Sequence, residues 1–430
     1  MTADPTSRFE RPKRPLPISL LNAVGRGAAR MGLEPRLDVD SLIGSARKRA
    51  ELREFGDESF REPLSVLIDS LESEARLSTL GRIIQRRRFV DALINRLRVQ
   101  QLLREHPEIE TIPLDRVVVI AGLQRTGTTT LHRLLASNPG ARSLASWEAV
   151  NPAPFPGEKP GQATARMRLA RRAEQGLKYL APQFFAIHPV EHDAPEEDVL
   201  LLDHHFMSQS AEAMARVPSY AAWLEEQDNR PAYEYMATLM RVLLWQRPGR
   251  HWVLKTPHHL EYLDTLFAVL PGSRVIQTHR DPQKTTASFC SMVAHGACIF
   301  SDDVDADELA EHWLGKIRRV LERSMAVRAR LPDHYFLDVS YYDLVAEPIK
   351  VLEAIHSFAG LEFGQAEERA ARETSERNVQ HRFGQHRYSL TDFGLDAERL
   401  ESELGFYRSH YGVPFESGMH ERDAQEQGSA

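Results

Sequence analysis

The sequence predicts an α/β fold: a three-layer sandwich with a central parallel sheet, preceded by a helical extension. Short apolar runs rich in β-branched residues are typical of strands buried on both faces of a parallel sheet. Longer helical stretches separate these runs, and strands that alternate with helices are typical of α/β domains. Four runs have this character: 117–121, 251–254, 274–278 and 335–339.

Residues 1–111 are predicted to form the helical N-terminal extension. From about residue 40 to 105 the chain is rich in Leu, Arg, Glu and Ala, and apolar positions such as Val90, Leu93 and Leu97 repeat at helical spacing. His106-Pro107 interrupts the pattern. We therefore expect a catalytic domain over residues 112–415, followed by a disordered tail at residues 416–430.

An amphipathic helix is expected over residues 18–33. Apolar Leu20, Val24 and Met31 alternate there with Arg26 and other polar positions. Such a helix either packs on the protein's own core or lies on a lipid surface. Packing on the core is the favoured interpretation, and peripheral contact with a membrane is left open.

Composition and charge restrict the class of protein. The 430 residues are 42% hydrophobic and 27% charged, with a formal net charge of -7. This composition is typical of a globular protein, and the negative charge argues against a nucleic-acid partner. Two cysteines, Cys290 and Cys298, and no apolar stretch of eighteen residues predict a cytoplasmic protein without a transmembrane segment.

The first strand run leads directly into a glycine-containing loop, Gly-Leu-Gln-Arg-Thr-Gly-Thr-Thr-Thr, and then into a helical pattern. Strand, glycine loop and helix form a phosphate cradle, because amide groups at a helix start point at an anion. Gly122 and Gly127 have the spacing of a P-loop, but Thr128 stands where that motif requires lysine, and the positive charge is at Arg125 instead. This favours a P-loop-like fold that grips a less charged terminal group than a triphosphate. The loop residues expected at the anion are Arg125, Thr126, Gly127, Thr128, Thr129 and Thr130.

A second motif follows the third strand run. Arg280 leaves this strand, and Ser288 lies eight residues later on a new helix. Together with the loop, this motif resembles those of sulfotransferases that use 3′-phosphoadenosine 5′-phosphosulfate (PAPS). The resemblance extends from about residue 117 to 413 and implies that the loop binds the 5′-phosphosulfate, while Arg280 and Ser288 bind the 3′-phosphate. It further implies that Arg382 and Gly384 belong to a late loop closing over the 3′-phosphate.

Sulfuryl transfer needs positive groups near the reacting oxygens and a base for the acceptor's proton. Arg125 and Lys255 are the electrostatic candidates, since each follows a strand that should end at the nucleotide. Glu148 is the leading candidate for the base, from its resemblance to the catalytic glutamate of tyrosylprotein and some bacterial sulfotransferases. His258 is its rival, from a resemblance to the lysine-threonine-histidine segment of cytosolic sulfotransferases, and Glu197 in the acidic turn is the third.

Residues 184–223 are expected to form the acceptor pocket. Phe184, Phe185, Phe206 and Trp223 would line it, which favours a small-molecule or lipid acceptor. Histidines and carboxylates at 188–198 lack the helical pairing of a metal site, so no metal is expected.

Two other functions are compatible with a phosphate cradle. A P-loop kinase would use ATP and magnesium, but it requires a lysine at Thr128. A non-catalytic nucleotide-binding protein would keep the cradle and lose Lys255 and the base. The sequence has candidates for both of these groups.

Overall fold

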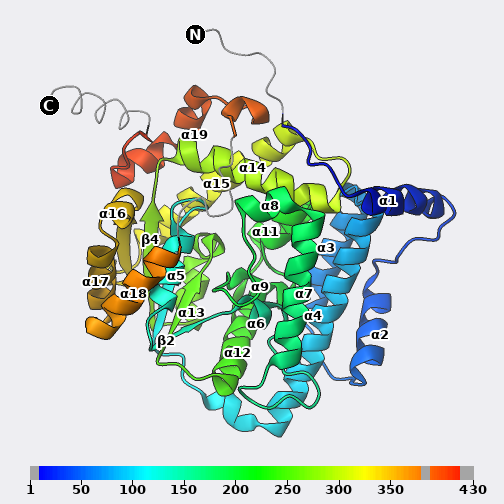
Figure 1. Cartoon of the computed structure of the whole chain (residues 1–430), viewed down its shortest axis with the longest axis horizontal. Coiled ribbons are helices and arrows are strands. Elements are labelled where there is room, and N and C mark those ends of the chain that lie inside the picture. Colours follow the sequence, from blue (N-terminus) through cyan, green and yellow to red (C-terminus); the bar gives the residue numbers. More distant parts are fainter. Residues whose placement is uncertain (1–8, 379–387, 417–430) are drawn as a thin grey trace.

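The sheet at the centre of the protein has five parallel strands. A computed structural model of the chain describes residues 9–378 and 388–416 (Figure 1). The strand order is β2-β3-β1-β4-β5, and every neighbouring pair is parallel. The α/β fold with a parallel sheet is therefore confirmed. The strands are β1 (Val117–Ile120), β2 (Ala141–Ser143), β3 (His251–Lys255), β4 (Ser273–His279) and β5 (Phe336–Ser340).

Helices cover both faces of the sheet. Side chains along a strand point alternately to its two faces, and on each face the apolar ones are buried beneath helices. Val118 and Ile120 of β1 face a layer of helices that includes α5 and α17, whereas Val117 and Val119 face the larger core on the other side. The four predicted strand runs match β1, β3, β4 and β5. Strand β2 was missed, since Ala-Arg-Ser has neither an apolar run nor the length of a typical strand.

The helices make up most of the remaining described chain. The first half contains α1 (Leu16–Ala29), α2 (Val39–Ala50), α3 (Arg61–Glu74), α4 (Thr79–Glu105), η1 (Pro107–Thr111), α5 (Thr128–Ala136), α6 (Ser146–Val150), α7 (Thr164–Leu180), α8 (Pro182–Ile187), α9 (Val199–Leu202) and η2 (Asp203–His205). Then come α10 (Ser210–Met214), α11 (Pro218–Glu226), α12 (Arg230–Gln246), η3 (Pro257–Glu261), α13 (Leu263–Val269), α14 (Pro282–Phe300) and α15 (Ala306–Arg328). The C-terminal part contains η4 (Asp333–Tyr335), α16 (Tyr341–Ala346), α17 (Pro348–Ala359), α18 (Gln365–Arg377), η5 (Leu390–Phe393) and α19 (Ala397–Tyr411).

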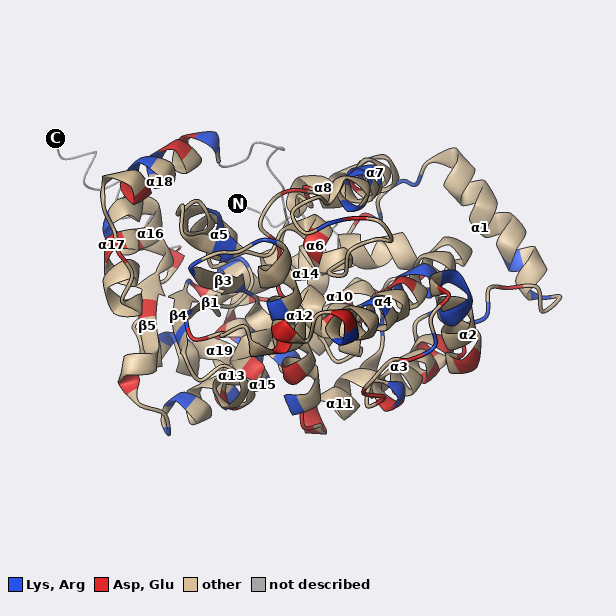
Figure 2. Cartoon of the chain, turned by 90° about the horizontal axis from the view of Figure 1, so that it is seen from below, with Lys and Arg blue, Asp and Glu red and all other residues tan. Residues whose placement is uncertain are grey.

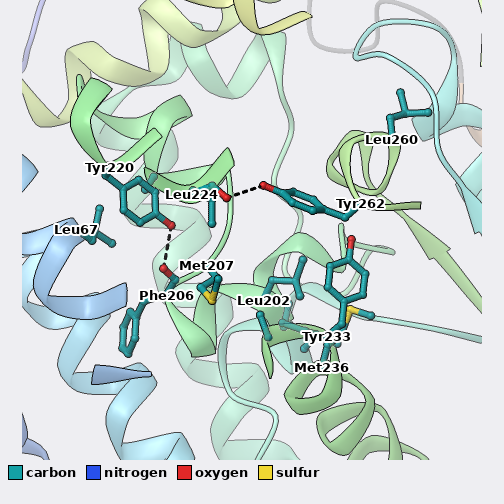
Figure 3. Close-up of a cluster of buried hydrophobic side chains, with 14 of the residues drawn as sticks. Leu67, Leu202, Phe206, Met207, Tyr220, Leu224, Tyr233, Met236, Leu260 and Tyr262 are labelled. Atoms are coloured by element: carbon teal, nitrogen blue, oxygen red, sulfur yellow. Dashed lines mark hydrogen bonds between the residues drawn. The ribbon is translucent and has the colours of Figure 1, made fainter. Parts of the chain in front are cut away.

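The N-terminal helices share a hydrophobic core with the rest of the protein. Helices α2–α4 lie on the side of the molecule opposite α16–α18 (Figure 1). Leu67 of α3 and Phe89 of α4 belong to the same buried cluster as Phe206 and Met236 (Figure 3). The division of the chain at residue 111 stays a prediction, and residues 417–430 of the expected tail lie outside the described residues.

Helix α1 does not pack its apolar face on the core, contrary to the favoured interpretation of the sequence. Leu16, Leu20 and Val24 are all strongly exposed, and Asn22 is buried instead. The physical reason is that α1 contacts the protein through Asn22 and Gly25. The polar side chain of Asn22 is buried there, and Gly25, which has no side chain, allows close approach to Thr79. Within the described residues, no helix is long and apolar enough to cross a membrane.

Candidate functional site

The loop between β1 and α5 has the form of a phosphate cradle. Gly127 has φ 86° and immediately precedes α5, a left-handed conformation that glycine adopts without steric cost. Gly122 allows a close approach, since a Cβ there would lie 2.0 Å from Oγ1 of Thr278. Thr126 is buried, and its hydroxyl contacts the carbonyl of Leu123 and the Thr278 hydroxyl, each at 2.6 Å. The contact with Thr278 fixes the loop on the end of β4.

The threonines of the cradle differ in exposure. Thr128 is buried, whereas Thr129 and Thr130 are exposed in the first turn of α5. The first amide groups of a helix have no acceptor within the helix, and the helix dipole adds partial positive charge there. This turn therefore offers amide and hydroxyl donors to an anion.

The structure brings Arg125, Arg280 and Ser288 together. Arg125 donates from Nε to the Ser288 hydroxyl on α14 at 3.0 Å, and Arg280 donates to the Arg125 carbonyl at 3.0 Å. The Arg280 guanidinium also lies over the Tyr341 ring, 4.0 Å from its centroid. The loop and the second motif, about 150 residues apart in the chain, thus form one basic site. The predicted Arg382 and Gly384 lie outside the described residues.

Glu416 forms an ion pair with the side chain of Arg280. Its two carboxylate oxygens accept hydrogen bonds from Arg280 at 2.5 and 3.2 Å. The amide of Glu416 donates to Asp281 at 2.9 Å, which places the end of the described chain on the β4–α14 junction. A carboxylate therefore fills a position on Arg280 that an anionic ligand could take.

Lys255 ends β3 and pairs with the acidic turn. Its buried side chain donates from Nζ to Glu197 at 2.5 Å, and its amide donates to Asp198 at 2.7 Å. The Glu197 side chain is 23% exposed, so it remains accessible from solvent. The acidic turn, which holds the third candidate for the base, is thus the one in contact with Lys255.

Asp198 is held from a second side. His259 contacts its other carboxylate oxygen at 2.6 Å, and the Tyr233 hydroxyl lies 2.8 Å from the opposite nitrogen of that histidine. Burial opposes ionisation of Asp198, but the charge and hydrogen bond of His259 lower its pKa below the usual value. This buried network fixes the backbone that positions Lys255.

His188 lies close to these charged groups, although sequence analysis considered it only as a metal ligand. Burial, together with the charges of Lys255 and Arg125 and against the influence of Glu197, lowers its pKa to about 4. The imidazole is therefore neutral at physiological pH. His188 lies four residues after Phe184, within the predicted acceptor region, but no motif in the sequence singles it out.

Glu148 lies inside an ion-pair network and not beside Lys255. Arg142 donates to both of its oxygens at 2.9 and 2.8 Å, Arg247 donates at 3.3 and 3.0 Å, and the Ala145 amide donates at 3.0 Å. The side chain is fully buried. Burial opposes ionisation, but the two arginines lower its pKa below the usual value. A carboxylate held in this way is a weak proton acceptor, and its geometry is that of a structural anchor.

His258 is directed into the core. Its ring lies 4.8 Å from Tyr262 and 6.5 Å from Tyr233, and neither ring nitrogen has a hydrogen-bond partner. Burial, followed by the charge of His259, lowers its pKa well below the usual value. Figure 3 shows both tyrosines inside the buried cluster. The fold therefore separates His258 from Lys255, despite their closeness in sequence.

An apolar cavity of about 320 Å³ lies between helices α3 and α4 on one side and α6, α9 and α10 on the other. Leu67, Phe89 and Ala92 line it from α3 and α4, and Leu200 and Phe206 line it from the other side. Of the four aromatic residues expected around an acceptor, only Phe206 is part of this lining. The cavity thus takes residues including Leu200, Phe206 and Tyr220 from the predicted region 184–223, whereas the lining outside that region comes from α3, α4 and α6, which the sequence did not indicate.

The described residues, 9–378 and 388–416, contain no group of three or more His, Cys, Asp or Glu side chains that could hold a metal ion. His192 contacts Glu174 at 2.6 Å, and His204 contacts the carbonyl of Ala149 at 3.0 Å. These histidines serve as hydrogen-bonding groups within the fold.

Known proteins resemble this chain in sequence and in structure. The model of the sulfotransferase family matches residues 117–365. Sulfotransferase STF1 from Mycobacterium tuberculosis is 33% identical, with a TM-score of 0.76 over 85% of this chain and 98% of that one. Sulfotransferase STF9 from Mycobacterium avium is 26% identical, with a TM-score of 0.79 over 89% of this chain and 98% of that one. The comparison with curated proteins gives no match.

Proposed function

The chain belongs to the sulfotransferase family, and from this we propose that it transfers a sulfuryl group from PAPS to a hydroxyl or amine of a small or lipophilic acceptor. PAPS, when bound, supplies the sulfuryl group and a bisphosphate leaving group. The observation that carries the proposal is the linkage of the cradle to Arg280 and Ser288 through Arg125. Two anion sites side by side suit a nucleotide with phosphate at both its 5′ and 3′ positions.

The residues of the cradle fit the 5′ end of such a nucleotide. The first turn of α5, with Thr129 and Thr130 exposed, would bind the phosphosulfate oxygens. Arg280 and Ser288 would bind the 3′-phosphate through one charge and one hydroxyl. The expected roles of Arg382 and Gly384 remain proposals of the same kind.

Lys255 and Arg125 are proposed as the positive groups at the reacting centre. Lys255 is buried, so its charge acts in a region of low dielectric, where it stabilises the developing negative charge of the leaving phosphate. Lysine can also give that oxygen a proton, whereas arginine stays protonated. Breaking the sulfur–oxygen bond to the bisphosphate would thus be assisted from the end of β3.

Glu197 is proposed as the base in place of Glu148 and His258. It alone of the three contacts Lys255, and it is open to solvent. Its carboxylate would accept the proton of the acceptor's hydroxyl or amine as that atom attacks the sulfur in line. The burial of Glu148 between two arginines and of His258 among tyrosines supports this reassignment.

The apolar cavity supports a small or lipophilic acceptor. Its lining reaches Leu200, three residues after Glu197, so an apolar part of the acceptor could lie there. We also propose a cytoplasmic location, because Cys290 and Cys298 are both free thiols.

A kinase that uses ATP and magnesium is the second candidate for a chain with this cradle. Thermal unfolding with adenosine 3′,5′-bisphosphate, compared with ATP plus magnesium, separates the two functions. We expect only the bisphosphate to raise the melting temperature clearly. Stabilisation by ATP and magnesium alone would reject the sulfotransferase proposal.

A non-catalytic nucleotide-binding protein is the third candidate. It would bind the bisphosphate but transfer no label from sulfur-labelled PAPS to any acceptor. The ion pair of Lys255 with Glu197 favours an enzyme, since a binding protein has no need of a partly exposed carboxylate at this position.

A further inference from the structure

Helix α1 is attached to the protein through its polar side. Asn22 is 2% exposed; its Oδ1 accepts from the Leu80 amide at 3.0 Å, and its Nδ2 donates to Asp302 at 3.4 Å. Gly25 lies so close to α4 that a Cβ there would be 2.1 Å from Oγ1 of Thr79. These contacts determine which side of α1 faces the protein.

The apolar side of α1 faces solvent as a consequence. Leu16, Leu20 and Val24 repeat every four residues along one side and are 84%, 66% and 64% exposed. Met31 and Leu33, just after the helix, are each 70% exposed. Surface helices of globular proteins normally have the opposite arrangement. We call these five side chains the α1 face.

The charges around the α1 face are mainly positive. From Phe9 to Leu33 the chain carries five basic residues and one acidic residue: Arg11, Lys13, Arg14, Arg26 and Arg30, with Glu10. Figure 2 shows α1 at the periphery of the molecule. The only charged residue within α1 is Arg26. Asp302 pairs with Arg14 and Arg26, and Asp303 pairs with Arg11. The segment is thus basic within a chain whose net charge is -7.

We propose that the α1 face docks the protein on the surface of an anionic lipid bilayer. An apolar face flanked by Lys and Arg is the arrangement of helices that lie in the membrane interface. The basic residues complement anionic headgroups, whereas a second copy joined by a two-fold axis would bring the same basic segments together. This docking does not depend on the proposed sulfuryl transfer.

Vesicle co-sedimentation of the full chain tests the docking. The two vesicle types are phosphatidylcholine alone and phosphatidylcholine mixed with phosphatidylglycerol. We expect binding to the mixed vesicles only, decreasing as salt rises. Leu20→Glu combined with Val24→Glu should lower the partition at least about tenfold, because both side chains lose their apolar contact with lipid.

Val345→Glu is the matched control, since Val345 is 60% exposed on α16 and this helix lies on the opposite side of the molecule from α1 (Figure 1). It should bind vesicles as the unchanged protein does. No binding to mixed vesicles, equal binding to both vesicle types, or equal loss in the control would each overturn the proposal. So would sedimentation velocity showing a dimer that the α1 variant dissociates, since that result assigns the face to a second copy.

Discussion

Glu197 and Lys255 meet at the carboxyl end of β3, where the acidic turn reaches the sheet. If Glu197 accepts the acceptor's proton, Glu197→Gln should lower kcat about a hundredfold or more while bisphosphate affinity stays within a few-fold. Single-turnover transfer from labelled PAPS and calorimetric titration measure the two quantities.

Asp193→Asn serves as the control for this variant, because Asp193 is an exposed carboxylate in the same turn. Its kcat should be close to that of the unchanged protein. Full activity of Glu197→Gln would move the base to another residue. A loss of bisphosphate binding would instead make Glu197 a structural partner of Lys255.

Glu148 gives a contrasting prediction, about stability. Glu148→Gln should lower the free energy of unfolding by about 3–5 kcal/mol, because Arg142 would stay buried without its counter-charge. Since the folded pKa of Glu148 is below the unfolded value of about 4.3, its contribution is present above that pH and is lost as pH falls through the folded pKa.

Urea unfolding of both proteins between neutral and acidic pH checks this prediction. The difference between them should shrink as the pH falls below about 4. A variant of unchanged stability that binds the bisphosphate but has no turnover would restore Glu148 as the base.

At the scale of elements, the C-terminal segment contacts the nucleotide site that we propose. Because Glu416 pairs with Arg280, a 3′-phosphate would have to displace its carboxylate. Glu416→Gln should therefore tighten bisphosphate binding about fivefold, or about 1 kcal/mol. Calorimetric titration measures the change, with Glu373→Gln on α18 as the control. Unchanged or weaker binding would show that Glu416 does not compete with the ligand.

The sequence allowed prediction of those elements whose signal is local. Strand β1, the cradle and α5 are contiguous, so their order and glycines predict the geometry directly. The Arg280 motif could be paired with the cradle because parallel strands end at the same edge of the sheet. Strand β2 is too short and polar for such a signal.

The base that we propose was harder to predict, because its position depends on contacts between distant segments. Glu148 follows β2 closely, but Arg142 and Arg247 enclose it, and Arg247 is about a hundred residues away in sequence. His258 is three residues from Lys255, yet η3 turns it into the core. Only folding brings Glu197 to Lys255, and the orientation of α1 likewise depends on Asn22 and its distant partners.

At the scale of the whole molecule, the extension and the catalytic region depend on each other. Phe89 of α4 and Phe206 are in edge-to-face contact at 5.8 Å, and one buried cluster spans both regions. A chain of residues 112–430 should therefore be aggregated or unfolded, because it lacks α2–α4 and this buried cluster would be exposed to water. Circular dichroism and size-exclusion chromatography check this, and a stable, monomeric fragment would show that the two regions fold independently.

We propose that one site binds the two ends of a 3′-phosphorylated nucleotide. Calorimetric titration of adenosine 3′,5′-bisphosphate and adenosine 5′-monophosphate, with the unchanged protein and Arg280→Ala, tests it most directly. We expect the 3′-phosphate to improve Kd about a hundredfold in the unchanged protein and only about two- to threefold in the variant. Equal Kd values for both nucleotides in the unchanged protein would contradict it.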